Sequence, residues 1–236
     1  MFKNKNILIT GASGDIGSKI AHDLFLKEAN IFLTARNKKT LIDFEAKYKC
    51  KSNFIIADLK ENSDIINLAN QLPELNGIVI NAGTLFYSPV KHLNYNKLTE
   101  IFQVNFFSNV VLISQLLKKR KILNNSSIVF IGSISSMIAT QATSAYASSK
   151  AALLSFSKVL AAELAPKKIR VNVVSPGLIN TKMTTEINKF NELEKSYPFG
   201  LGEIDDISNQ VIFLLSNKSK WTTGSNFVLD GGFFLK

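Results

Sequence analysis

The chain has very few of the residues that build disulfides and metal centres. Its 236 residues include one cysteine, Cys50, and two histidines, His22 and His92. One cysteine cannot close an internal disulfide, and neither histidine stands at a spacing typical of metal ligands. We therefore expect no metal site and a reducing, cytoplasmic location.

Long hydrophobic runs are also missing. The apolar run after the basic start of the chain is about four residues long, whereas the core of a signal peptide needs about seven or more. No run approaches the roughly 18 apolar residues of a membrane span. These absences predict neither export nor membrane insertion.

Acidic residues are scarce relative to basic ones. The chain has 28 Lys and Arg against 18 Asp and Glu, a formal net charge of +10. The basic residues are scattered lysines, apart from Arg36, Arg120, Arg170 and one dense run at Lys118–Lys121. Because there is no recognition motif and no single basic stripe, we expect no nucleic-acid partner. The excess of positive charge is typical of a lysine-rich surface, and some of these residues can bind an anionic cofactor or substrate.

Apolar runs alternate with longer helical patterns along the chain, and apolar residues make up 46% of it. Seven runs rich in Ile, Val and Phe read as strands buried on both faces: Asn6–Thr10, Asn30–Thr34, Asn53–Ala57, Gly77–Asn81, Ser127–Gly132, Arg170–Ser175 and Asn226–Leu229. Helical stretches between them give a repeated βαβ pattern. The sequence predicts one doubly wound, Rossmann-like α/β domain over residues 1–236, with a central, mostly parallel seven-stranded sheet. Ligands of such a sheet bind beyond the carboxyl ends of the strands.

The stretch 178–202 does not follow this alternation of strands and helices. It follows Pro176 and Gly177 directly, has no strand pattern and mixes apolar with polar residues. A segment of that length after a strand is more typical of a lid over a ligand site than of a spacer.

A glycine-rich turn follows the first predicted strand and opens a helix. Its glycines permit a tight turn and a close approach of the backbone to a pyrophosphate, and the helix N-terminus offers free N–H groups. The residues that we expect to contact a dinucleotide are Gly11, Ser13, Gly14, Asp15, Ile16 and Gly17. The alternative is an ordinary turn between a strand and a helix.

The end of the second predicted strand bears on the choice of cofactor. An acidic residue there would bind the ribose 2′-hydroxyl of NAD, and none is present. Arg36 occupies that turn instead, followed by Lys38 and Lys39. A guanidinium can hold a 2′-phosphate with two hydrogen bonds, so we predict NADP rather than NAD. The alternative is a solvated surface arginine.

Two further strand ends carry candidate cofactor contacts. Asp58 and Leu59 follow the third strand, and Asp58 could accept a hydrogen bond from the adenine amino group or cap the next helix. Asn81, Ala82 and Gly83 end the fourth strand, where small residues would let the chain lie against the cofactor. A plain turn is the alternative there.

Tyr146 and Lys150 stand at i and i+4 in the run Ala145–Leu164, which is predicted to be a helix, so both side chains share one face. A neutral tyrosine with a pKa near 10 is a poor acid–base group at pH 7. A neighbouring ammonium would favour the phenolate and lower that pKa. Ser133, at the end of the fifth strand, could hydrogen-bond a reacting carbonyl oxygen.

Together these marks resemble the short-chain dehydrogenase/reductase family. They occur in the family's order over residues 5 to 232: the glycine turn, Asn81-Ala82-Gly83, Asn105, Ser133, Tyr146, Lys150, Pro176-Gly177 and Asp230-Gly231-Gly232. The resemblance implies that Tyr146 is the general acid in reduction, that Lys150 lowers its pKa and holds the nicotinamide ribose, and that Ser133 orients the carbonyl.

The resemblance assigns roles to five further residues. It implies that Asn105 holds a water in a proton relay and that Thr181 contacts the carboxamide. Pro176, Gly177 and Ile179 are expected to contact the cofactor beside it.

One position departs from the family pattern. The middle glycine stands one place early, at Gly14, and Asp15 fills its usual position. A negative charge beside phosphates is unfavourable unless it points away, and Asp15 could cap the first turn of the helix instead.

The resemblance implies reduction of a ketone to a secondary alcohol. Within the family, the chain resembles 3-oxoacyl-(acyl-carrier-protein) reductases in a general way. The expected substrate pocket lies between Ser133–Gln141, Thr84–Tyr87 and the lid. Its expected apolar wall consists of Phe86, Met137, Ile138, Met183, Tyr197 and Phe199. An acidic carrier protein could dock on Lys118–Lys121 with Lys167 and Lys168, and a solvated helix end is the alternative.

Two other functions stay open. One is a sugar, polyol or cyclic alcohol dehydrogenase with the same residues, and the other is a non-catalytic NADP-binding regulator. The family resemblance also implies a homotetramer or dimer, packed through helices near Phe102–Lys119 and Tyr146–Ala165. The apolar end Phe233–Leu235 is predicted to be buried, against a neighbouring subunit.

Overall fold

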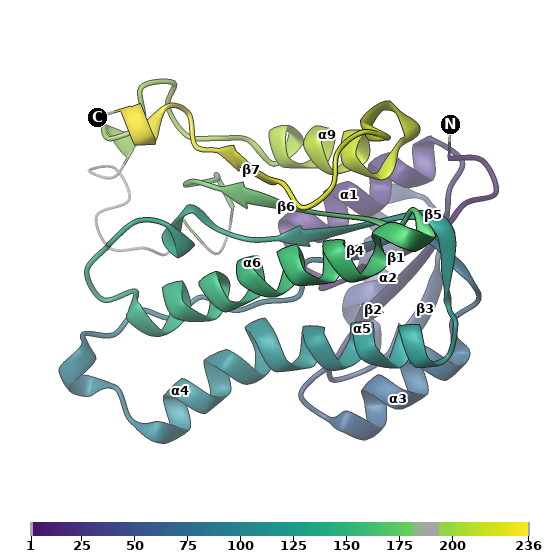
Figure 1. Ribbon diagram of the computed structural model, residues 1–236, viewed down its shortest axis with the longest axis horizontal. Helices are drawn as coiled ribbons and strands as arrows, with labels where there is room; N and C mark the ends of the chain where they lie inside the picture. Colours follow the sequence, from purple (N-terminus) through teal and green to yellow (C-terminus); the bar gives the residue numbers. More distant parts are fainter. Residues whose placement is uncertain (1, 182–183, 185–193, 236) are drawn as a thin grey trace.

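Every predicted apolar run forms a strand in the computed structural model, which describes residues 2–181, 184 and 194–235 (Figure 1). The strands are β1 Asn6–Thr10, β2 Asn30–Ala35, β3 Asn53–Ile56, β4 Leu75–Ile80, β5 Ile122–Ile131, β6 Arg170–Pro176 and β7 Asn226–Leu229. They form one sheet in the order β3-β2-β1-β4-β5-β6-β7, and every pair of neighbours is parallel. The predicted doubly wound sheet is confirmed.

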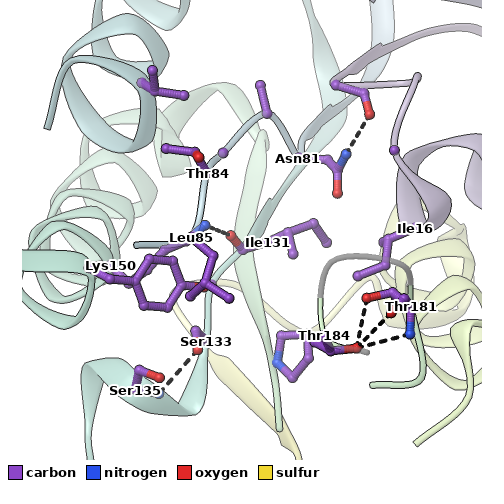
Figure 2. Close-up of a pocket in the computed structure, with 18 of the residues that line it drawn as sticks. Ile16, Asn81, Thr84, Leu85, Ile131, Ser133, Ser135, Lys150, Thr181 and Thr184 are labelled. Atoms are coloured by element: carbon purple, nitrogen blue, oxygen red, sulfur yellow. Dashed lines mark hydrogen bonds between the residues drawn. The ribbon is translucent and has the colours of Figure 1, made fainter. Parts of the chain in front are cut away.

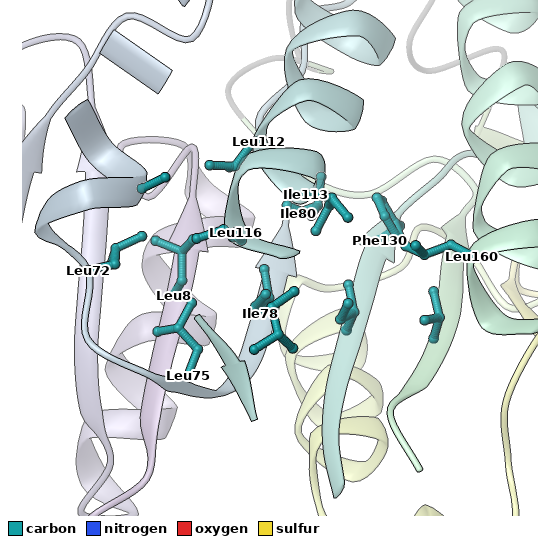
Figure 3. Packing of buried hydrophobic residues seen from close by; sticks show 14 of the residues in the cluster. Leu8, Leu72, Leu75, Ile78, Ile80, Leu112, Ile113, Leu116, Phe130 and Leu160 are labelled. Carbon is teal, nitrogen blue, oxygen red and sulfur yellow. The ribbon is translucent and has the colours of Figure 1, made fainter. Parts of the chain in front are cut away.

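Helices cover both faces of this sheet. On one face lie α1 Asp15–Leu26, α2 Lys38–Tyr48 and α9 Ile204–Leu215, and on the other lie α3 Asn62–Gln71, α4 Tyr95–Phe102, α5 Ser108–Lys118 and α6 Ser144–Leu164. Alternate strand residues point to opposite faces, so Ile7 and Ile9 pack in one core and Leu8 in the other. Figure 3 shows Leu8 of β1 beside Leu116 of α5 in this second core, to which Ile78 and Leu112 also belong.

Short helical turns complete the described elements. They are η1 Val90–His92, η3 Ile134–Ser136, η4 Ala165–Lys167, η5 Asn217–Ser219 and η6 Phe233–Leu235.

One long helical stretch, Tyr95–Lys118, contains α4 and α5 joined by the π-helical turn η2, Gln103–Phe107. By length and composition alone it could cross a membrane, with a mean hydropathy of 1.2. Its apolar side chains Leu112, Ile113 and Leu116 are buried against the sheet, as in a core helix. The π-turn adds a residue to the helical repeat and turns Asn105 inward, where it is fully buried.

The strand order reverses between β1 and β4, and side chains join the two strand ends there. Thr10 Oγ1 accepts hydrogen bonds from the N–H groups of Asn81 and Ala82, each at 3.0 Å. Asn81 Nδ2 donates to the carbonyl oxygens of Thr10 and Gly11 at 3.1 and 3.0 Å. Crevices at such reversals are where doubly wound sheets bind their ligands.

The two ends of the stretch 178–202 come together beside β6. Asn180 N–H donates to Gly202 O at 2.9 Å, and Gly202 N–H donates to Leu178 O at 3.1 Å. Met183 and Lys182, which the sequence placed in this stretch, lie outside the described residues. The prediction that the C-terminal end is buried is wrong for the chain by itself, because Leu235 is 84% exposed. Within the described residues, the ring of Phe233 contacts its neighbour Phe234 and also Tyr197, at 4.9 Å between centroids.

Candidate active site

Close packing fixes two of the three glycines in the turn between β1 and α1. Gly11 has a φ of +63°, and a Cβ on it would lie 2.9 Å from Ala82 Cα. A Cβ on Gly17 would lie 2.5 Å from the Gly11 carbonyl oxygen. Gly14 is the N-cap of α1 with φ −83°, and a Cβ there would have room. The shift of the middle glycine therefore does not strain the turn.

The start of α1 is suited to an anion. Gly14, Asp15 and Ile16 line the main cavity, and the first N–H groups of a helix have no acceptor within the helix. Asp15 is the first residue of α1 and not its cap, and the helix dipole favours a negative charge in that first turn. The backbone thus forms a cradle that fits a pyrophosphate.

Ser133 and Tyr146 meet at the carboxyl ends of the strands. Ser133 follows β5, and its Oγ accepts a hydrogen bond from Ser135 N–H at 3.1 Å (Figure 2). Burial raises the pKa of Tyr146 to about 12, although the Ser133 side chain acts in the opposite direction. The expectation of a lowered pKa is wrong for the protein by itself, because burial of the phenol outweighs its polar contacts.

Lys150 lies one turn further along α6, with its Nζ 5.9 Å from the centroid of the Tyr146 ring. Nζ donates to Ile131 O at 2.9 Å, and burial lowers the pKa of this lysine to about 8 (Figure 2). A Cβ on Gly83 would lie 3.4 Å from this Nζ, so glycine allows the strand end after β4 to approach the ammonium. At neutral pH the side chain is still mainly charged.

Asn105 braces the loop that follows β4. Its Oδ1 accepts from Thr84 N–H at 2.7 Å, and its Nδ2 donates to Thr84 O and to Ser149 Oγ, both at 3.0 Å. Its backbone carbonyl accepts from Asn109 Nδ2 at 2.9 Å. Both amide hydrogens and the amide oxygen take part in joining the helical stretch, the loop and α6, so the role of Asn105 in these contacts is positioning. The expected water relay remains a prediction.

One cavity of about 820 Å³ brings most of the predicted site residues together. Those that line it are Gly11, Ser13, Gly14, Asp15, Ile16, Arg36, Asp58, Leu59, Asn81, Ala82, Gly83, Ser133, Tyr146, Lys150, Pro176, Gly177, Ile179 and Thr181. Gly17 and Asn105 are not in the lining, because they support it from behind. No cluster of three or more His, Cys, Asp or Glu side chains suited to a metal occurs within the described part of the chain.

The far end of the cavity fits the adenosine part of a dinucleotide. Arg36 is exposed at the end of β2, and Thr34 Oγ1 beside it is buried without a hydrogen-bond partner among the described residues. Asp58 does not cap the next helix, whose N-cap is Glu61. Its Oδ1 instead accepts from Lys60 N–H at 3.0 Å, and the adenine contact remains a prediction.

The predicted apolar wall is only partly correct. Ile138 and Tyr197 line the cavity. Phe86, Met137 and Phe199 do not, because the ring of Phe86 lies 5.6 Å from Lys97 Nζ, Met137 Sδ accepts from Asn226 Nδ2, and Phe199 is 85% exposed.

Several lining residues were not predicted. They include Thr34, Ala35, Val104, Ser108, Thr143 and Phe233. Thr34 and Ala35 could have been found because they end the strand that carries Arg36. Phe233 had no such signal, since only the tertiary contact with Tyr197 brings it there.

Comparison with known proteins identifies the family. A family model described as enoyl-(acyl carrier protein) reductase matches residues 11–234. A 3-oxoacyl-(acyl-carrier-protein) reductase FabG of Rickettsia bellii is 29% identical, over 97% of this chain and 96% of the relative. D-erythrulose reductase of Gallus gallus is 32% identical, over 99% and 97%. A blue fluorescent protein from a metagenomic library, solved in complex with NADPH, is 26% identical, with a TM-score of 0.90 and 98% of each chain covered.

The chain belongs to the short-chain dehydrogenase/reductase family. It is therefore an oxidoreductase that uses a nicotinamide dinucleotide, NAD(P). In this short-chain dehydrogenase/reductase, the glycine turn, Ser133, Tyr146 and Lys150 share a single cavity, as the order of strands in the sheet requires.

Proposed function

We propose that this short-chain dehydrogenase/reductase reduces a ketone of the 3-oxoacyl thioester type to a secondary alcohol, with NADPH as reductant. The observation that carries the proposal is that Ser133, Tyr146 and Lys150 line the same cavity as the glycine turn. The similarity to a Rickettsia bellii reductase that acts on 3-oxoacyl groups supports the thioester class.

The chemistry follows from the protonation states of the side chains. NADPH supplies the hydride when it is bound. The Ser133 hydroxyl donates to the ketone oxygen and orients it toward Tyr146. The raised pKa of Tyr146 keeps its phenol protonated at neutral pH, so it gives its proton to the oxygen as negative charge develops there. The Lys150 ammonium then stabilises the phenolate that is left.

Reduction assays test this assignment. NADPH oxidation is followed with acetoacetyl-N-acetylcysteamine, for the wild type, Tyr146→Phe and the matched control Tyr95→Phe, whose ring is 81% exposed on α4. We expect Tyr146→Phe to lose most turnover and to keep its affinity for NADP, and the control to behave as the wild type. Full activity of Tyr146→Phe would refute the role of this tyrosine.

Other substrates decide between the remaining functions. Reduction of D-erythrulose in place of the thioester would support a sugar reductase, for which the 32% identity to the Gallus gallus enzyme is the specific observation. A crotonyl thioester tests the activity that the family model's description suggests. Binding of NADP without turnover of any substrate would support a regulator.

Arg36 is the residue on which the preference for NADPH depends. It lines the cavity, and it forms no ion pair with any of the described residues, so its guanidinium can take a 2′-phosphate. We expect Arg36→Gln to raise the Kd for NADPH about tenfold or more and to leave that for NADH nearly unchanged. Arg120→Gln, at an exposed site after α5, is the matched control. An equal rise in the Kd values for NADPH and NADH would refute the role of Arg36 in a preference for NADPH.

The lysine run at Lys118–Lys121 is not retained as a carrier-protein docking face. It precedes β5, whereas Ser133 follows the opposite end of the same strand, about 20 Å away, because Ile122 pairs with Leu75 and Phe130 with Ile80 across β4. Lys121 Nζ also donates to Leu72 O at the end of α3. The alternative of a solvated helix end fits better.

We also propose that the protein forms a tetramer or dimer through the α4–α5 stretch and α6, as predicted. Phe107 and Val159 support this, because they are 44% and 56% exposed on these helices. Light scattering at micromolar concentration tests the assembly, and a monomer would refute it.

A further inference from the structure

The loop between Thr84 and Ser88 is fixed against the active site at both ends. Asn105 holds both backbone groups of Thr84, at 2.7 and 3.0 Å. Ser88 N–H donates to Ala142 O at 2.7 Å, in the segment just before the helix that carries Tyr146. The position of this loop is therefore fixed relative to the Tyr146 side chain.

Most of this loop faces the cavity. Thr84, Leu85 and Tyr87 line it, whereas Phe86 lies against Lys97. Figure 2 shows Thr84 and Leu85 on this wall of the cavity. Tyr87 comes next toward the opening and is 45% exposed.

Three tyrosines, Tyr87, Tyr146 and Tyr197, line this one cavity. A charge on Tyr87 would raise the pKa of both other phenols. Partial burial also raises the pKa of Tyr87 itself, and the group stays a neutral donor. Within the described residues its hydroxyl makes no hydrogen bond, unlike Tyr197, whose hydroxyl accepts from Leu178 N–H at 3.1 Å.

We infer that Tyr87 is a substrate-binding residue whose hydroxyl donates to a second oxygen of the substrate, beside the carbonyl held by Ser133 and Tyr146. This inference rests on the proposed reduction of a ketone and narrows its substrate class. The substrate is a ketone with a neighbouring oxygen, as in the thioester carbonyl of a 3-oxoacyl group or the hydroxyl of a ketose. A simple alkyl ketone has no such oxygen.

The test is a change in substrate preference of Tyr87→Phe. We would measure kcat/KM with NADPH for acetoacetyl-N-acetylcysteamine and for 2-pentanone, which lacks the second oxygen. Where 2-pentanone is not turned over, its inhibition constant takes the place of kcat/KM. Because Tyr87→Phe removes one neutral hydrogen bond to the thioester, we expect the ratio of kcat/KM for the thioester to that for 2-pentanone to fall about two- to tenfold. The change should arise mainly from a higher KM for the thioester.

Tyr95→Phe is the control for the removal of a tyrosine hydroxyl outside the cavity. An equal loss for both substrates, or an unchanged preference, would overturn the inference and leave the proposed reduction intact. If the wild type reduces D-erythrulose in place of the thioester, the same comparison is made with D-erythrulose. A wild type that reduces none of these ketones would overturn the proposed function and this inference together.

Discussion

Replacement of Gly17 by alanine is the sharpest test of the glycine turn. In a helix interior, alanine is favoured over glycine by about 1 kcal/mol. At this position, however, the new Cβ would lie 2.5 Å from Gly11 O and 2.6 Å from Asn81 Nδ2. Because both atoms belong to the junction of β1 and β4, relief of the clash must disturb that junction.

The net effect follows from three contributions. Overpacking of a tight site costs about 1–3 kcal/mol. Loss of the two hydrogen bonds from Asn81 Nδ2 adds about 1 kcal/mol each where they break. After the gain in helix propensity, we expect Gly17→Ala to lower the free energy of unfolding by about 2 kcal/mol. For a chain of this length that corresponds to a fall in Tm of about 4–8 °C.

Gly14→Ala is the matched control, since the nearest atom to its Cβ would be 3.6 Å away and its φ of −83° suits alanine. We expect this variant to lose about 1 kcal/mol or less, because alanine is only a poorer N-cap. Urea unfolding followed by far-UV circular dichroism measures both. Fluorescence is a poor probe, because the single tryptophan, Trp221, is 97% exposed. A loss for Gly14→Ala that equals or exceeds that for Gly17→Ala would refute the steric argument.

Two further predictions concern buried polar side chains. Lys150 has a folded pKa of about 8 against an ordinary 10.5, so the unfolded chain binds more protons between those values. The stability of the wild type relative to Lys150→Met should therefore rise with pH from about 8 to 10.5. Urea unfolding at pH 7.5 and 9.5, with exposed Lys158→Met as control, checks this, and a constant difference would contradict it. Asn105→Ala removes three side-chain hydrogen bonds and should cost roughly 2–4 kcal/mol. Exposed Asn96→Ala on α4 is the control, and a cost of Asn105→Ala below about 0.5 kcal/mol would show that the amide is not a brace.

The strands and the glycine turn could be predicted because local pattern determines them. Continuous apolar runs such as Ile7–Ile9 are buried in any doubly wound sheet, and the spacing of Tyr146 and Lys150 follows from helix geometry. The orientation of Phe86 could not be predicted, because the hydrogen bonds that its loop donates to Asn105 Oδ1 and Ala142 O set the register of the loop.

The raised pKa of Tyr146 could not be predicted from the sequence either. It depends on how deeply the whole cavity buries the phenol, whereas the sequence showed only the neighbouring lysine. Asp58 is a similar case, because either a cap or an Asx turn is compatible with its position after a strand.

The link between Thr10 and Asn81 also has a consequence for synthesis. The two residues are 71 positions apart in the chain. At about 5–20 residues per second, a ribosome adds the second about 4–14 s after the first. During that interval the nascent β1 turn lacks the two N–H groups that bind Thr10 Oγ1 and the Asn81 side chain that binds the Gly11 carbonyl. The dinucleotide cradle is thus completed only when β4 has been translated, and a cofactor cannot assist the folding of the segment before β4.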